Sequence, residues 1–356
     1  MDEELLHIGK HTTTISVIIP ARDEEQNISR CLKSVLQQDY DINLFEVIII
    51  DDHSTDQTAS IAKSLSQENL NIIALDKILI NNTINSYKKR AIEVGISIAK
   101  GELIVCTDAD CIAPKKWLQT IAGFYEHTNA EFISAPVKFH DITGKGFFKR
   151  LLYIFQTLDF TSLQGIGGAA TASGFHYMCN GANLAFTKKS FFEVGGYKDI
   201  DDIASGDDML LMEKFADAYP GKVKFIKSRE AIIETAPALS LKTFIRQRIR
   251  WASKAGKYKT SSTKIVLATV YLLNVLLILT AILCFFNSNY LLYFLSAVIL
   301  KTAFEIWFLL PVAHFFKNKS LLVWFIPAVP FHIIYTVIAG AFGMFGKYEW
   351  KGRVVK

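Results

Sequence analysis

Leu103-Ile104-Val105-Cys106-Thr107-Asp108-Ala109-Asp110 joins an apolar run to two carboxylates. Its apolar first half predicts a buried β-strand, and the two carboxylates follow at the carboxyl end of that strand. Open α/β sheets bind ligands at this edge. Two carboxylates one residue apart suit a hard divalent cation, Mg2+ or Mn2+, whose other positions water and a diphosphate can fill. Taken alone, the pair is also typical of a surface turn.

Strand and helix patterns alternate on both sides of this stretch. Apolar or β-branched runs predict strands at 15–19, 47–50, 71–75, 103–107 and 132–136. Apolar periodicity predicts helices at 24–38, up to about 65, at 84–99 and up to about 125, and Ser54 or Thr55 is expected to cap the second of them. The alternation predicts an α/β fold with a Rossmann-like, mostly parallel, doubly wound sheet. Further on, 144–163 is amphipathic and aromatic, and 165–174 is expected to be a mobile loop or a plain connector.

Three apolar segments, 265–286, 290–316 and 321–345, dominate the carboxyl-terminal third. Each is long enough to cross a bilayer, which takes roughly 20 helical residues. Residues 1–10 do not resemble a signal peptide, so the first 240 or so residues are expected in the cytoplasm. The odd cysteine count, five, agrees with that compartment, and Cys106 and Cys111 lack the partners of a zinc site.

A basic block separates the two halves. Residues 242–264 contain eight Lys or Arg and no acid, within a net charge of +5. Beside an apolar segment, such a block faces an anionic cytoplasmic leaflet far more often than nucleic acid, so no nucleic-acid partner is expected.

The simple count of three crossings conflicts with the tail. It would place the basic residues of 347–356 outside, against the positive-inside rule. Lys301 and Glu305 can pair within the second segment, and Pro327 and Pro330 suggest that the third is broken or partly interfacial. A cytoplasmic tail is therefore expected.

Five polar motifs appear in a fixed order along the chain. They are Pro20-Ala21-Arg22-Asp23-Glu24, Asp51-Asp52, Asp108-Ala109-Asp110, Gly206-Asp207-Asp208 and Gln247-Arg248-Ile249-Arg250-Trp251. The set resembles the inverting family 2 glycosyltransferases of the GT-A fold over roughly residues 14 to 260. The tail sequence Trp350-Lys351-Gly352-Arg353 is similar to the ending of some membrane-bound members.

The resemblance implies a binding site for the nucleotide-sugar donor. The backbone of Pro20, Ala21 and Arg22 would lie along the nucleotide, with Glu24 in the same motif, although the family often has an aromatic residue at position 21. Asp52, supported by Asp51, would accept a hydrogen bond from the imide of uracil, and Lys88 would contact phosphate. Plainer alternatives are a helix N-terminal acid for the Asp pair and a solvated helix face for Lys88.

The resemblance also assigns the chemistry. Asp110 would bind the divalent metal, and Asp108 would share the ion or contact the ribose. Asp208 would be the general base, with Asp207 and Asn183 on the acceptor side. The family commonly has Glu at position 207. The alternatives are helix capping for the Asp207-Asp208 pair and a turn for the segment 180–183.

Gln247, Arg250 and Trp251 share one face of a helix by their i, i+3, i+4 spacing. In the family this motif lies over the donor diphosphate and the acceptor entrance; Arg suits phosphate and Trp offers a surface for a sugar. A basic amphipathic helix at a membrane would show the same residue types. The expected organisation is a cytoplasmic catalytic domain at 1–237, an interfacial helix at 238–260, a transmembrane region at 264–346 and a basic tail at 347–356.

These features predict an integral membrane enzyme that moves a sugar, most simply from a UDP-sugar, to a lipid-linked or membrane-embedded acceptor with inversion. One alternative is a processive polysaccharide synthase, which would need more membrane helices unless the chain oligomerises. Another is a non-catalytic membrane scaffold with a degenerate transferase domain. The sugar, the acceptor and the oligomeric state do not follow from the sequence.

Overall fold

The computed structural model describes residues 11–75, 86–141, 146–201, 206–345, 348–350 and 353–355. It divides into two compact units. The sheet unit comprises Met1–Phe139 and Gly167–Ala236, and the helical unit comprises His140–Ile166 and Pro237–Lys356. Residues 140–166, which fall inside the range expected for the catalytic domain, therefore group with the helical unit.

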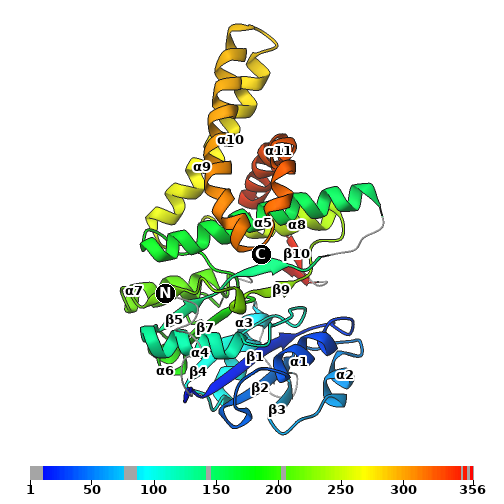
Figure 1. Ribbon diagram of the computed structural model, residues 1–356, viewed down its shortest axis with the longest axis vertical. Coiled ribbons are helices and arrows are strands. Elements are labelled where there is room, and N and C mark those ends of the chain that lie inside the picture. Colours follow the sequence, from blue (N-terminus) through cyan, green and yellow to red (C-terminus); the bar gives the residue numbers. More distant parts are fainter. Residues whose placement is uncertain are drawn as a thin grey trace. The chain divides into compact units, whose positions relative to one another are not determined.

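A seven-stranded sheet forms the centre of the sheet unit (Figure 1). Its strand order is β3-β2-β1-β4-β7-β5-β8. The strands are β1 (Ile15–Ala21), β2 (Phe45–Asp51), β3 (Leu70–Ala74), β4 (Leu103–Cys106), β5 (Phe132–Ser134), β7 (Leu184–Thr187) and β8 (Val223–Phe225). Only β7 runs antiparallel to its neighbours among these strands. The predicted α/β class with a mostly parallel sheet is thus confirmed.

Amphipathic helices bury one face each in this unit. In α1 (Ile28–Leu36), Ile28, Leu32 and Val35 are buried, as their spacing predicts. The other helical segments are α2 (Thr58–Ser64), α3 (Tyr87–Ile98), α4 (Trp117–Thr128), α6 (Lys188–Glu193), α7 (Met209–Ala218), η2 (Ile42–Leu44) and η4 (Arg229–Ala231). A short parallel pair, β6 (Val137–Phe139) and β9 (Ile233–Thr235), completes the unit.

The predicted cap of α2 was wrong. The side chains of Ser54 and Thr55 bond instead to the backbone and the carboxylate of Asp23, and the carboxylate of Asp56 accepts the Thr58 N–H at 2.9 Å. A carboxylate two residues before the first helical residue satisfies an exposed N–H as well as a hydroxyl would.

The segment 165–174 was predicted as a loop or connector, but it continues the helix α5 (Phe147–Ser173) up to Ser173. Its glycines serve close packing. A Cβ on Gly165 would lie 2.7 Å from Cγ2 of Val312, and one on Gly168 would lie 2.9 Å from Cε1 of Phe225. Tertiary contacts therefore outweigh the low helix propensity of glycine.

The helical unit continues with α8 (Leu241–Ala252), α9 (Ser261–Leu283), α10 (Asn289–Phe315), η5 (Lys319–Trp324) and α11 (Phe325–Phe345). Three stretches, Ser261–Leu283, Asn289–Phe315 and Lys319–Met344, are long and apolar enough to cross a membrane. Within α10, the predicted pair forms, since Lys301 Nζ lies 2.6 Å from Glu305 Oε1. Of the predicted basic tail, only the backbone of the hairpin β10 (Tyr348–Trp350) and β11 (Arg353–Val355) is described.

Candidate active site

The carboxyl ends of β1, β2 and β4 meet at one edge of the sheet. The three strands are parallel, with Ala21 opposite Asp51 and Ile18 opposite Cys106. Ala21 is buried, and its carbonyl accepts the Asp52 N–H at 2.8 Å. The Asp51-Asp52 pair and the Asp108-Ala109-Asp110 motif therefore leave the sheet at the same edge, as the alternation predicts.

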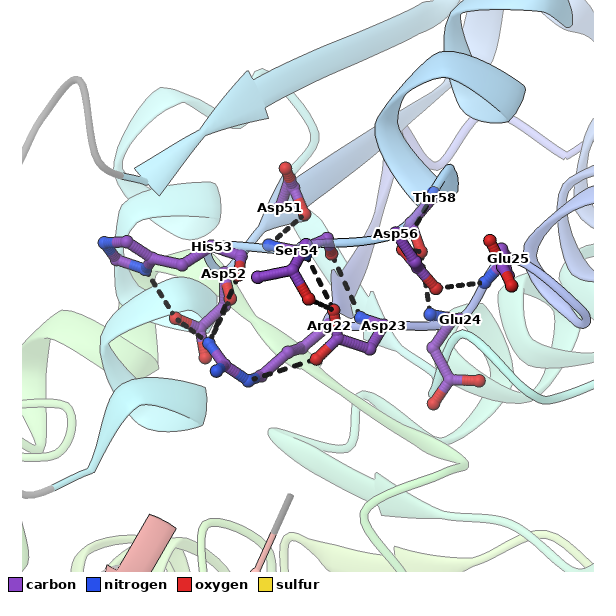
Figure 2. A network of polar contacts seen from close by, with 11 residues as sticks. Arg22, Asp23, Glu24, Glu25, Asp51, Asp52, His53, Ser54, Asp56 and Thr58 are labelled. Carbon is purple, nitrogen blue, oxygen red and sulfur yellow. Dashed lines mark hydrogen bonds and ion pairs between the residues drawn. The ribbon is translucent and has the colours of Figure 1, made fainter. Parts of the chain in front are cut away.

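Arg22 and His53 hold the Asp52 carboxylate (Figure 2). Arg22 Nη1 donates to the backbone carbonyl of Asp52 at 2.8 Å and lies 4.0 Å from Asp52 Oδ1. His53 Nδ1 lies 2.9 Å from the same carboxylate oxygen. His53 has a positive φ of 55° and meets the ring of Tyr87 edge-on. The Asp52 side chain is therefore buried, at 4% exposed, beside a His53 side chain that is 38% exposed.

The loops after β1 and β2 are tied together around this group. Asp23 Oδ1 accepts the Thr55 N–H at 2.8 Å, and Asp56 Oδ2 accepts the Glu25 N–H at 3.0 Å. Burial opposes ionisation of Asp56, but hydrogen bonds from Thr58 and from the Glu25 backbone outweigh it and lower the pKa of the carboxyl. Asp56, rather than Asp51 or Asp52, is thus the acid at the start of α2.

Glu24, predicted in the donor motif, makes a local contact in this structure. Its Oε2 accepts the side-chain N–H of Asn27 at 2.8 Å, and its backbone N–H donates to the Thr58 hydroxyl. Both contacts fix the turn between β1 and α1.

Lys88 joins two of the predicted acidic motifs. From the first turn of α3, its Nζ lies 2.8 Å from Asp108 Oδ1 and 3.0 Å from Asp207 Oδ2. Burial disfavours the charged amine, but the two carboxylates outweigh that cost and raise the pKa of Lys88 well above its ordinary value. Lys88 is a bridging cation in this structure rather than a solvated residue on a helix face.

Asp208 stands next to this bridge at the N-terminus of α7. Its Oδ1 accepts the Met209 N–H at 2.8 Å and its Oδ2 accepts the Gly181 N–H at 3.1 Å. The Asp208 carboxylate therefore caps α7, as the helix-capping alternative expects, and it is also the carboxylate that the resemblance assigns as the base. Gly181 is close to the whole group, since a Cβ there would lie 3.3 Å from Asp207 Oδ2 and 3.5 Å from Lys88 Nζ.

Asp108 and Asp110 offer hard oxygen ligands at the end of β4. Asp110 Oδ2 accepts the Thr235 hydroxyl at 3.3 Å, and its Oδ1 accepts the thiol of Cys111 at 3.5 Å. Burial raises the pKa of the Cys106 and Cys111 thiols. In the described part of the chain no three His, Cys, Asp or Glu residues form a ready-made metal cage. The two carboxylates suit an ion that completes its shell with water and a diphosphate.

Asn183, predicted on the acceptor side, is a scaffold residue. It is fully buried, its Nδ2 donates to the carbonyls of Pro136 and Ala231 at 2.8 Å, and its Oδ1 accepts the indole N–H of Trp117 at 3.0 Å. Both of its amide hydrogens are used within the protein, so we assign it to holding three chain segments together.

The motif Gln247-Arg248-Ile249-Arg250-Trp251 lies on α8 in the helical unit. The Trp251 ring has Phe160 of α5 on one side, at 6.2 Å between centroids, and the Arg248 guanidinium 4.2 Å from its own centroid. Arg248 Nη2 lies 2.6 Å from Asp159 Oδ2, and both side chains are 4% exposed.

Two kinds of residue escaped the sequence reasoning. Arg248 lies inside the predicted motif, and the sequence carries a signal for it, because it shares the apolar face of α8 with Phe244. Its partner Asp159 is the one acid of the aromatic stretch 147–166. Gly181 and His53 carry no comparable signal, because only the folded loops bring them to the acids.

Comparisons with known proteins agree with this architecture. The description "Glycosyl transferase family 2" matches residues 16–189, and "Glycosyl transferase family group 2" matches residues 103–340, which is well over half of the chain. The mannosyltransferase PcManGT from Pyrobaculum calidifontis, solved with GDP-Man and Mn2+, has a TM-score of 0.53 and 19% identity, over 96% of this chain and 92% of that one. This similarity confirms the predicted GT-A fold.

Curated relatives align over shorter stretches. The glycosyltransferase AglE of Haloferax volcanii is 32% identical over 35% of this chain and 40% of its own length. A dolichyl N-acetyl-alpha-D-glucosaminyl phosphate 3-beta-D-2,3-diacetamido-2,3-dideoxy-beta-D-glucuronosyltransferase of Methanococcus voltae is 28% identical over 33% of this chain and 35% of its own length. The chain thus aligns with well under half of either relative. With its sheet unit and most of its helical unit matched, the chain belongs to the glycosyl transferase family group 2, with a glycosyl transferase family 2 domain over residues 16–189.

Proposed function

We propose that the protein transfers a sugar from a nucleotide diphosphate sugar, with a UDP-sugar as the first candidate, to a lipid or lipid-linked acceptor. The observation that carries this proposal is the Lys88 bridge, which brings Asp108 of one motif and Asp207 of another to a single cation beside Asp208. A surface turn and a helix cap would have no reason to converge in this way.

The donor half of the proposal rests on the sheet edge. A buried carboxylate fixed by Arg22, such as Asp52, can accept a hydrogen bond from the imide of a uracil ring. Asp108 and Asp110 would hold a divalent ion, which when bound neutralises charge on a leaving diphosphate. A metal role is compatible with the mannosyltransferase of the same fold, which was solved with GDP-Man and Mn2+.

Asp208 is our candidate for the general base. A carboxylate held by two backbone N–H groups keeps a fixed direction, and it would take the proton of an acceptor hydroxyl while that oxygen attacks the anomeric carbon. The attack comes from the face opposite the nucleotide, so the anomeric centre inverts. The family resemblance assigns Gln247, Arg250 and Trp251, which lie on α8, to the donor diphosphate and the acceptor entrance.

Membrane attachment supports a lipid acceptor. Three helical stretches are apolar enough to cross a bilayer, and the basic α8 precedes them directly. The Methanococcus relative is named for a dolichyl phosphate substrate. We place the sheet unit in the cytoplasm, on the side of the basic block.

The test is turnover of radiolabelled UDP-sugars by the full chain in detergent, with Mn2+ or Mg2+ and total membrane lipid. Asp208→Asn keeps the size and one acceptor oxygen of the side chain, and it should lower kcat by about a hundredfold to ten-thousandfold. Asp41→Asn changes the carboxylate that caps η2, outside the candidate site, and serves as the matched control, with activity retained.

Undiminished activity in Asp208→Asn would remove this residue as the base. Binding of UDP without turnover across a broad donor panel would favour the scaffold alternative. A ladder of products on a gel would favour the processive synthase over single transfer.

A further inference from the structure

The hairpin of α9 and α10 begins and ends beside the same two helices. α8 ends at Ala252 and α9 begins at Ser261. At the other end, Leu309 and Ala313 of α10 pack against Ile154 and Leu158 of α5. α5 and α8 lie side by side, because the rings of Phe155 and Phe244 meet at 5.6 Å. Figure 1 shows the α9–α10 turn extending well past α11.

Both ends of α11 lie against these helices as well. Phe325, its first residue, packs on the cluster formed by α5 and α10. Near its other end, a Cβ on Gly343 would lie 2.8 Å from Cβ of Ala252 in α8. A straight helix of this length spans about 30 Å. If it crossed a bilayer, its two ends would lie on opposite faces and only one could reach α5 or α8.

The middle of α11 carries polar contacts that a bilayer centre would penalise. The Tyr335 hydroxyl donates to Asp159 Oδ1, and His332 Nε2 lies 3.9 Å from the same atom. Asp159 also pairs with Arg248 at 2.6 Å. A crossing α11 would carry this ion pair and the basic α8 toward the bilayer centre, where each charge costs several kcal/mol.

α11 has an exposed apolar face. Ile326, Ile334, Ile338 and Phe342, separated by multiples of four residues, are 64%, 50%, 39% and 61% exposed. On the inner face Val329, Ile333 and Ala339 are buried. We call the four exposed residues the α11 stripe. An exposed apolar face, with the polar contacts of Tyr335 and His332 elsewhere on the helix, suits the plane of a membrane interface.

We propose that only α9 and α10 cross the membrane, and that α11 lies within one leaflet beside α8, with the α11 stripe in the acyl chains of that leaflet. The carboxyl-terminal strand β10 then remains on the side of α8, against which it packs. This arrangement removes the conflict between three apolar segments and a basic tail. The inference rests on the membrane attachment proposed above.

Single cysteines in the full chain test the arrangement in intact cells. In a Cys179→Ser, Cys284→Ser background, in which the remaining Cys31, Cys106 and Cys111 are buried, Ser288→Cys marks the α9–α10 turn, Ser320→Cys marks the α10–α11 connection, and one cysteine is appended after Lys356. Each is treated with a membrane-impermeant maleimide before and after the cells are permeabilised. Extraction with alkaline carbonate is run in parallel, because release of the chain would defeat membrane attachment itself.

The expected result is that Ser320→Cys and the appended cysteine behave alike and Ser288→Cys behaves oppositely. Accessibility that differs between Ser320→Cys and the appended cysteine would show that α11 crosses and would overturn the proposal. Equal accessibility of Ser288→Cys and Ser320→Cys would overturn the α9–α10 hairpin. The experiment asks only whether two cysteines lie on the same side of the membrane, so its outcome does not depend on which side the sheet unit occupies. The same labelling data also show which side that is.

Discussion

At the scale of single residues, the site depends on charges that neutralise one another. Lys88 is the central example, since one ammonium satisfies carboxylates from two motifs far apart in the chain. Removing it would leave two partly buried acids without a counter-ion, which costs more than the loss of one hydrogen bond.

Lys88→Met should therefore lower kcat/KM by about a hundredfold or more, because the acids would repel each other and the site would lose its geometry. Steady-state kinetics measure kcat/KM of this variant, in which the neighbouring buried lysine, Lys89, is unchanged. Activity within about threefold of the unaltered protein would contradict a role for the bridge.

The raised pKa of Lys88 also sets a pH dependence. Its folded-state value lies above the unfolded value of about 10.4, so its stabilisation is fully present below that pH and is lost as the pH rises through the folded-state pKa. The difference in unfolding temperature between the unaltered protein and Lys88→Met should be the same at pH 7 and pH 9. A difference that changed between pH 7 and pH 9 would show that the folded-state pKa of Lys88 is lowered rather than raised.

Cysteine reactivity reports on burial in the same unit. Burial raises the pKa of Cys31, Cys106 and Cys111, so few of these thiols are ionised at pH 8. Iodoacetamide should modify them far more slowly in the folded protein than in urea, as followed by mass spectrometry. Rapid modification of Cys106 or Cys111 would mean that the end of β4 is open to solvent.

At the scale of elements, close approach of backbones decides where small residues must stand. Gly101 precedes β4 and lies against β1, where an added Cβ would be 2.5 Å from the Ser16 backbone nitrogen. Backbone cannot move aside as a flexible side chain can, so this contact helps to set the pairing of the two strands.

Gly101→Ala should reduce the free energy of unfolding by about 1–3 kcal/mol or more, because the overpacking falls on the β1–β4 pair. Gly256→Ala, where nothing lies within 4 Å of the added Cβ, is the matched control and should leave stability nearly unchanged. Thermal unfolding in detergent compares the two, and equal stabilities would contradict the close packing.

A second prediction concerns the buried ion pair between Asp159 of α5 and Arg248 of α8. Arg248→Met should destabilise the protein by about 3–5 kcal/mol, because it leaves the Asp159 carboxylate buried without its cation. The double variant Asp159→Leu with Arg248→Met should recover much of that loss, since apolar pairs replace buried ion pairs at little cost. An unchanged melting temperature in Arg248→Met would show that the pair is open to water.

At the scale of the whole molecule, ligand binding should report on the complete donor site. UDP with Mn2+ should stabilise the folded protein and so raise its unfolding temperature. At a UDP concentration a hundredfold above Kd, the free energy of unfolding should increase by about 2.7 kcal/mol. EDTA should remove most of the shift, and so should Asp110→Asn, if the ion joins protein to diphosphate. Equal shifts with and without EDTA would contradict a metal at Asp108 and Asp110.

Much of the fold followed from local pattern. The sequence predicts the strand that precedes Asp108 and Asp110, the parallel arrangement of β1, β2 and β4, and the three apolar stretches. These features are predictable because burial imposes periodicity on a sequence. The helix at 165–173 was not predictable in this way. Its glycines are required by close contacts with Val312 and Phe225, which lie far away in the chain.

The fold class, the family and most candidate acids can therefore be read from local sequence pattern. The charges that meet, Lys88 with Asp108 and Asp207, and Arg248 with Asp159, are known from the folded chain alone. The folded chain also shows that both ends of α11 return to α5 and α8. The physical reason is that hydropathy measures the length and polarity of a segment, whereas pairing and topology depend on contacts between segments that no local pattern encodes.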